Sequence, residues 1–171
     1  MVLEVGKPAP LFSGYIETGE KIDLKNVIGR DYIILYFYPK DDSFGCKREA
    51  CEFRDEFDEF KMLDATVFGV SVDSIQSHME FKKKRNLPFH LISDPDEKIW
   101  KLYDVKARSL QYMNQRVTYI IDTYGIIRYV YSSQIHFRNH PIESRNALLK
   151  MKDLDARKAV LSILNKSYWT T

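Results

Sequence analysis

Cysteine is scarce in this chain: only Cys46 and Cys51 occur among its 171 residues. Two cysteines cannot build the disulfide framework of a small secreted protein, and a closely spaced pair is more typical of a catalytic or redox function in a reducing compartment. Residues 1–10 also lack the charged and then apolar layout of a signal peptide. We therefore expect a cytoplasmic protein.

A strong net charge and long apolar runs are also missing. Lys and Arg number 26 against 24 Asp and Glu, so no general attraction to nucleic acid or to a membrane surface is expected. No apolar run approaches the length of a membrane-spanning helix. Since internal repeats and low-complexity tracts are lacking too, residues 1–171 are interpreted as one domain with a helical extension over about 141–171.

Histidine, with four residues, gives little support for a metal or hydrolase site. A cysteine hydrolase would need His78, His90, His136 or His140 as its base, and no sequence pattern places one of them against Cys46. His136 and His140 lie close enough in sequence to share a metal, but a third ligand of suitable spacing is lacking. The spacing of the two cysteines does not suit zinc either. The sequence therefore predicts no metal and no cofactor.

The apolar pattern predicts an alternation of strands and helices. Dense β-branched and aromatic residues predict a hairpin at 11–24 and strands at 32–38, 65–72, 116–122 and 126–131. Helical spacing predicts helices over about 46–63, 74–85, 96–103 and 141–167, the last with a break at 151–155. Residues 105–115 are predicted to form a surface loop. The strand–helix–strand order implies parallel strands joined by a right-handed crossover, which indicates the α/β class.

Cys46 lies at the predicted junction between a strand, which ends before Pro39, and a helix. A helix N-terminus has unpaired N–H groups and a partial positive charge, and both favour a thiolate over a thiol. Ser43 can cap this helix or donate its hydroxyl to the sulfur. Asp41 and Asp42 would raise the pKa of a nearby thiol, so we expect them to face solvent or to cap backbone groups.

Cys51 follows Cys46 on the same predicted helix. On an intact α-helix two residues at this spacing have Cα atoms about 8.6 Å apart, whereas a disulfide tolerates roughly 6.8 Å at most. The two cysteines can therefore bond only if the intervening helical turn unwinds. This spacing indicates a pair that starts apart and joins after a chemical event.

The segment 38–51, with the sequence YPKDDSFGCKREAC, resembles the active site of the PrxQ type of peroxiredoxin, also called bacterioferritin comigratory protein. The general peroxiredoxin pattern of proline, three residues, Thr or Ser, two residues and cysteine is met by Pro39, Ser43 and Cys46. The resemblance implies Cys46 as the peroxidatic cysteine and Cys51 as the resolving cysteine. It also implies a thioredoxin-like α/β sandwich, with a mixed central sheet flanked by helices and an N-terminal β-hairpin.

Other residues of the site also follow from the resemblance. Arg116, at the start of the strand at 116–122, matches the arginine that lies beside the peroxidatic sulfur in peroxiredoxins; Arg128 is the competing candidate. Glu49 matches a position that orients this arginine by a hydrogen bond. Gly45 belongs to the same motif, and Phe44 replaces the usual proline and adds an apolar ring at the mouth of the pocket.

The predicted reaction is the reduction of hydrogen peroxide and organic hydroperoxides. The resemblance implies recycling by a thioredoxin-like reductant, and we expect a monomer or a weak homodimer. Two other functions use the same cysteines. One is a redox sensor or holdase that exposes a binding surface on oxidation, and the other is a reductase of protein disulfides, which the long cysteine spacing disfavours.

Overall fold

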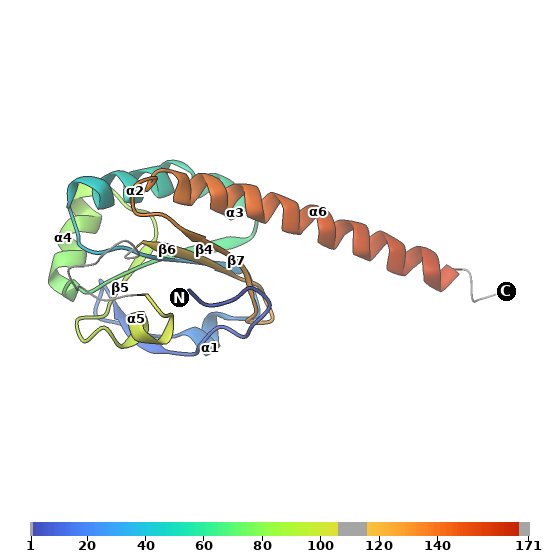
Figure 1. Cartoon of the computed structure of the whole chain (residues 1–171), viewed down its shortest axis with the longest axis horizontal. Helices are drawn as coiled ribbons and strands as arrows, with labels where there is room; N and C mark the ends of the chain where they lie inside the picture. Colours follow the sequence, from blue (N-terminus) through green and yellow to red (C-terminus); the bar gives the residue numbers. More distant parts are fainter. Residues whose placement is uncertain (1, 106–115, 168–171) are drawn as a thin grey trace.

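The computed structural model describes residues 2–105 and 116–167, which form a seven-stranded mixed sheet with helices on both faces (Figure 1). The strands lie in the order β2-β1-β5-β4-β3-β6-β7. They are β1 Ser13–Ile16, β2 Lys21–Asp23, β3 Tyr32–Phe37, β4 Ala65–Ser71, β5 His90–Ser93, β6 Val117–Ile121 and β7 Ile127–Ser132. The helices are α1 Leu24–Val27, α2 Phe44–Asp55, α3 Phe57–Met62, α4 Ile75–Arg85, α5 Lys98–Leu102 and α6 Asn139–Ser167. The mixed sheet, its flanking helices and the β1–β2 hairpin confirm the predicted α/β architecture.

Strand β3 is the centre of the core, and all six of its residues are buried. Because side chains alternate along a strand, they divide between two apolar clusters. Ile33, Leu35 and Phe37 pack on the face covered by α1 and α5. Ile34 and Tyr36 pack on the opposite face, which is covered by α2, α3, α4 and α6 (Figure 1).

The pairing of β3 places the ends of three elements together. β3 runs parallel to β4, so α2 and α3 form the predicted crossover between them. β3 runs antiparallel to β6, with Phe37 opposite Val117. The start of β6 therefore lies beside the end of β3, where the loop to α2 begins. Arg116, which directly precedes β6, is brought to this loop by strand register alone.

The helix predicted over 46–63 is two helices. α2 ends at Asp55 and α3 begins at Phe57, with Glu56 between them at φ −89° and ψ 1°. Both carboxylate oxygens of Glu56 accept hydrogen bonds from Arg145 of α6, at 3.0 and 2.8 Å. Apolar spacing did not reveal this turn, because both helices direct phenylalanines into the same cluster.

The predicted break at 151–155 is wrong, since α6 is continuous over its 29 residues. Asp153 forms an ion pair of 3.0 Å with Arg157, one helical turn away. The Tyr32 hydroxyl donates a hydrogen bond of 2.7 Å to Asp155. The acidic residues that suggested a break therefore have partners in an unbroken helix: Asp153 pairs with a residue of α6 itself, and Asp155 with a residue of the sheet.

The first part of α6 packs on the domain, whereas the side chains of residues 153–162 are exposed. Ala147, Leu148 and Met151 are buried, whereas Leu154 and Leu161 are exposed. Figure 1 shows the helix continuing well past the sheet. Within the described residues, neither α6 nor any shorter helix has the length and apolar character needed to span a membrane. The loop predicted at 105–115 lies outside the described residues, apart from Val105.

Candidate active site

Cys46 is the third residue of α2 and is only 1% exposed. Burial raises the pKa of its thiol above the ordinary value. The charge of Arg116, the Ser43 hydroxyl and the backbone N–H of Lys40 act in the opposite direction. The position at a helix N-terminus is as predicted, but burial outweighs the lowering of the pKa that this position alone would give. Ionisation of the sulfur therefore depends on its polar neighbours.

Arg116 is the cation of the site, and it is 4% exposed. Its Nη2 donates a hydrogen bond of 3.1 Å to Cys46 Sγ, and its Nη1 donates to Glu49 Oε2. The guanidinium carbon lies 5.7 Å from the centre of the Phe137 ring. The competing candidate, Arg128, lies on the edge strand β7. The structure thus brings Arg116, Cys46 and Glu49 into one buried cluster.

Glu49 is fully buried on α2, one helical turn after Cys46. Burial raises the pKa of its carboxyl group to about 8, against the opposing effects of the Arg116 charge and hydrogen bond. Its Oε1 lies 3.7 Å from Nδ1 of His140, which the sequence did not place near the site. His140 is also fully buried, and its Nδ1 lies 2.8 Å from the Thr118 hydroxyl.

The residues before Cys46 shape the approach to the cluster. Pro39 follows β3 and begins the loop. A side chain on Gly45 would place its Cβ 2.8 Å from Arg116 Nη2, so only glycine leaves room for the guanidinium at this position. Phe44 is 63% exposed, and its ring stacks with the guanidinium of Arg48, 4.2 Å from the ring centre.

Cys51 is half-buried further along α2. Both cysteines lie in the described part of the chain, and both are free thiols. α2 is helical over both of them, so the structure represents the separated state that the spacing predicts.

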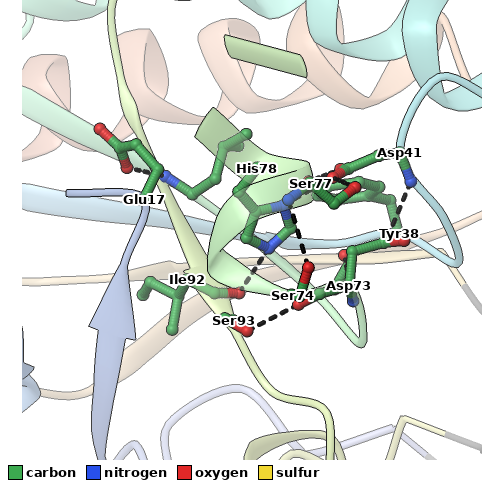
Figure 2. A network of polar contacts seen from close by, with 11 residues as sticks. Glu17, Tyr38, Asp41, Asp73, Ser74, Ser77, His78, Ile92 and Ser93 are labelled. Atoms are coloured by element: carbon green, nitrogen blue, oxygen red, sulfur yellow. Dashed lines mark hydrogen bonds and ion pairs between the residues drawn. The ribbon is translucent and has the colours of Figure 1, made fainter. Parts of the chain in front are cut away.

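Asp41 is buried and its carboxylate binds side chains, which corrects the expectation that it faces solvent or caps backbone groups (Figure 2). Its carboxylate accepts hydrogen bonds from the Tyr38 hydroxyl at 2.8 Å and from the Ser77 hydroxyl at 2.7 Å. It also contacts His78 Nδ1 at 2.8 Å, and the other ring nitrogen of His78 lies 3.2 Å from the carbonyl oxygen of Ile92. Polar side chains of Tyr38, directly after β3, and of α4 therefore fix the loop that leads to Cys46, and Ile92 of β5 fixes the His78 ring.

Asp42 holds the same loop from outside. It has a φ of +52° and forms ion pairs with Lys84 and Arg85 at the end of α4. Its side chain is 35% exposed, whereas that of Asp41 is 5% exposed. The two neighbouring aspartates thus bind to α4 in environments of very different polarity.

We expect Asp41→Asn to destabilise the fold by about 3 kcal/mol, because it leaves His78 and Ser77 without a carboxylate partner in a buried place. The matched control is Asp42→Asn, which keeps a side chain that tolerates positive φ and removes a more exposed ion pair. That change should cost less than about 1 kcal/mol. Urea unfolding measures both variants, and equal losses would contradict the assigned role of Asp41.

The other histidines have structural partners. The His90 ring has one, since its Nδ1 lies 2.9 Å from Glu17 Oε1; for His136 the hydrogen bond is made by the backbone N–H, which donates to the Ser133 hydroxyl. Within residues 2–105 and 116–167, no three His, Cys, Asp or Glu residues are grouped so that they could hold a metal ion. The cluster around Cys46 itself offers sulfur, guanidinium and carboxyl groups.

Known proteins resemble this chain in sequence. The profile of the AhpC/TSA family matches residues 5–130. Peroxiredoxin Bcp of Bacillus subtilis is 38% identical over 158 residues, which cover 90% of this chain and 99% of that protein. The chloroplastic peroxiredoxin Q of Oryza sativa subsp. japonica is 39% identical over 135 residues; the match covers 79% of this chain but only 62% of the rice protein.

Solved structures show the same fold. The peroxidoxin BcpB of Mycobacterium tuberculosis matches with a TM-score of 0.80 and 27% identity, over 86% of this chain and 97% of that chain. The bacterioferritin comigratory protein of Xanthomonas campestris, whose structures concern alkyl peroxide reduction, matches with a TM-score of 0.74 and 28% identity, over 82% of this chain and 91% of that chain. These matches confirm the thioredoxin-like fold and the predicted resemblance. The chain therefore belongs to the AhpC/TSA family of peroxiredoxins and, within it, to the Bcp/PrxQ type.

Proposed function

We propose that the chain is a thiol peroxidase that reduces hydrogen peroxide and organic hydroperoxides. The single observation that carries this proposal is the contact between a buried guanidinium and a cysteine at the first turn of a helix, Arg116 Nη2 to Cys46 Sγ at 3.1 Å. A cation in this place stabilises the thiolate and also the negative charge that develops on a departing oxygen. Membership of the Bcp/PrxQ type supports the same reaction.

In the first step, the Cys46 thiolate attacks the terminal oxygen of the hydroperoxide. The S–O bond forms as the O–O bond breaks, and the other oxygen leaves with a proton as an alcohol or as water. Cys46 becomes a sulfenic acid. Arg116 and the Ser43 hydroxyl are the groups positioned to hold the reacting oxygens, and Gly45 gives Arg116 the room to do so.

In the second step, Cys51 condenses with the sulfenic acid. Its sulfur attacks the sulfur of Cys46, the S–S bond forms and the hydroxyl group leaves as water. The helical turn between the two residues has to unwind first, because an intact α-helix holds them too far apart. A dithiol protein of the thioredoxin type then reduces the disulfide and restores both thiols.

We also propose that the chain works as a single domain, as a monomer or weak homodimer, in a reducing compartment such as the cytoplasm. The apolar clusters on the two faces of one sheet support the single domain, and two closely spaced cysteines in a redox cycle suit a reducing compartment. Peroxide-dependent turnover with thioredoxin, thioredoxin reductase and NADPH tests the proposed function directly. Comparing hydrogen peroxide with a bulky organic hydroperoxide tests the influence of the exposed Phe44 ring.

Cys51→Ser should separate the two steps. We expect this variant to consume one equivalent of peroxide at an unchanged rate and then to stop, because the sulfenic acid has no partner thiol. A dimedone-type reagent should trap that sulfenic acid on Cys46, as shown by mass spectrometry. Continued turnover with thioredoxin would mean that the reductant attacks the sulfenic acid directly and that Cys51 is not required.

A further inference from the structure

Two buried acids, Cys46 and Glu49, contact the same guanidinium. Arg116 donates to the sulfur from Nη2 and to the carboxyl group from Nη1. The side chain of Glu49 is fully buried and Cys46 is 1% exposed. If both groups were ionised, the single positive charge of Arg116 could balance only one of the two buried negative charges. Burial is the main influence on the pKa of Cys46, but a charge on Glu49 also raises it. The two acids therefore titrate as a coupled pair that competes for one cation.

His140 faces the free oxygen of Glu49. Within the described residues Glu49 Oε1 has no hydrogen-bond partner, and His140 Nδ1 lies 3.7 Å from it. The other ring nitrogen, Nε2, lies 2.9 Å from the carbonyl oxygen of Ser133. A carbonyl oxygen can only accept a hydrogen bond, so Nε2 carries the proton of the ring.

Nδ1 of His140 consequently presents a lone pair. Burial lowers the pKa of His140 to about 4, with the hydrogen bond to Ser133 acting in the opposite direction, so the ring is neutral near pH 7. The Thr118 hydroxyl, 2.8 Å away, then donates to Nδ1. The Thr118 hydroxyl occupies this lone pair, so the neutral ring has no proton to offer Glu49 Oε1. An ionised Glu49 would therefore direct an unpaired negative oxygen at an electron-rich nitrogen 3.7 Å away, whereas a protonated Glu49 places no charge there.

We propose that His140 is a positioning residue that keeps Glu49 protonated and so reserves the Arg116 guanidinium for the Cys46 thiolate. The inference rests on the proposed function, because a thiolate is useful here only to a reactive cysteine. It assigns a role to the start of α6, which supplies His140 and whose packing on β6 sets the distance to Glu49. The buried Tyr36 also interacts with Glu49: burial raises the pKa of Tyr36 well above its ordinary value, and the Glu49 charge raises it further.

The experiment measures the pKa of Cys46 in a Cys51→Ser background, where it is the only thiol, from the pH dependence of its alkylation by iodoacetamide. His140→Gln places an amide that can donate to Oε1 and so favours the ionised form of Glu49. We expect this variant to raise the pKa of Cys46 by about 1, which means about tenfold less thiolate at a pH below that pKa. An unchanged pKa in the folded variant would overturn the proposal.

A double-mutant cycle separates this role from simple packing. Glu49→Gln cannot ionise and so fixes the uncharged state that the proposal assigns to Glu49. We expect it to leave the pKa of Cys46 close to that of the unsubstituted protein, and adding His140→Gln should then have no further effect. An equal effect of His140→Gln with and without Glu49 would show that the histidine acts by another route. Alkylation needs no peroxide, so this result is distinguishable from a failure of the proposed peroxidase activity.

A measurement on the unsubstituted protein covers the case in which His140→Gln does not fold. Infrared spectroscopy detects the C=O band of a protonated carboxyl group, and its loss in Glu49→Gln assigns the band to this residue. We expect the protonated band near pH 7. A carboxylate band in its place would overturn the proposal.

Discussion

Replacing Cys46 with serine should remove peroxide consumption altogether. Serine has nearly the same shape, and its hydroxyl can still accept the hydrogen bond from Arg116, so we expect the fold to be kept with a loss of stability of about 1 kcal/mol or less. The alcohol oxygen is not ionised near neutral pH and cannot form a sulfenic acid, so the first step of the reaction has no nucleophile. Peroxide consumption with the thioredoxin system measures the loss.

The matched control for Cys46→Ser is Cys51→Ser, which also leaves one thiol. The remaining thiol is then in the cluster with Arg116 in one variant and outside it in the other. We expect rapid consumption of one equivalent of peroxide only when Cys46 is kept. Rapid consumption by Cys46→Ser would show that the environment of Cys46 is not what confers reactivity.

Much of the framework around this cysteine could be predicted from the sequence. Dense apolar runs identify the strands because buried strands need β-branched and aromatic side chains on both faces. Strand order then brings Arg116 to the end of β3. Because side chains alternate between the two faces along a strand, Thr118 lies on the same side of the sheet as Arg116. The sequence alone could therefore have predicted that Thr118 lies near the site.

His140 and Asp41 could not be placed in the same way. His140 reaches the cluster through the packing of α6 against β6, a contact between distant segments that no local pattern encodes. Asp41 belongs to a polar loop, and polar loops usually face water. It is buried because α4 covers it with Ser77 and His78, whose partners become visible only in three dimensions (Figure 2). The same limit applies to the pKa of Cys46, since the sequence shows the helix terminus but not the depth of burial.

Arg116→Met should slow the oxidation of Cys46 by hydrogen peroxide by roughly 100- to 1000-fold, the range found when one donor to a developing oxyanion is removed. Methionine keeps an unbranched chain in the space of the arginine stem and removes only the charge and the donors. Without the cation the pKa of Cys46 should rise, because Arg116 is the main group that opposes the effect of burial. Rapid mixing with peroxide measures the rate, and alkylation measures the pKa.

The pH dependence of the oxidation rate of Arg116→Met separates two causes of the lost rate. Raising the pH restores the thiolate, so the part of the loss that comes from ionisation should be recovered, while the part that comes from the unstabilised leaving oxygen should remain. Arg128→Met is the matched control, because Arg128 lies on the neighbouring strand and forms its ion pair of 3.0 Å with Asp122, away from the sulfur. It should leave the rate unchanged. Complete recovery of the rate of Arg116→Met at high pH would mean that the guanidinium serves only to ionise Cys46 and takes no part in breaking the O–O bond.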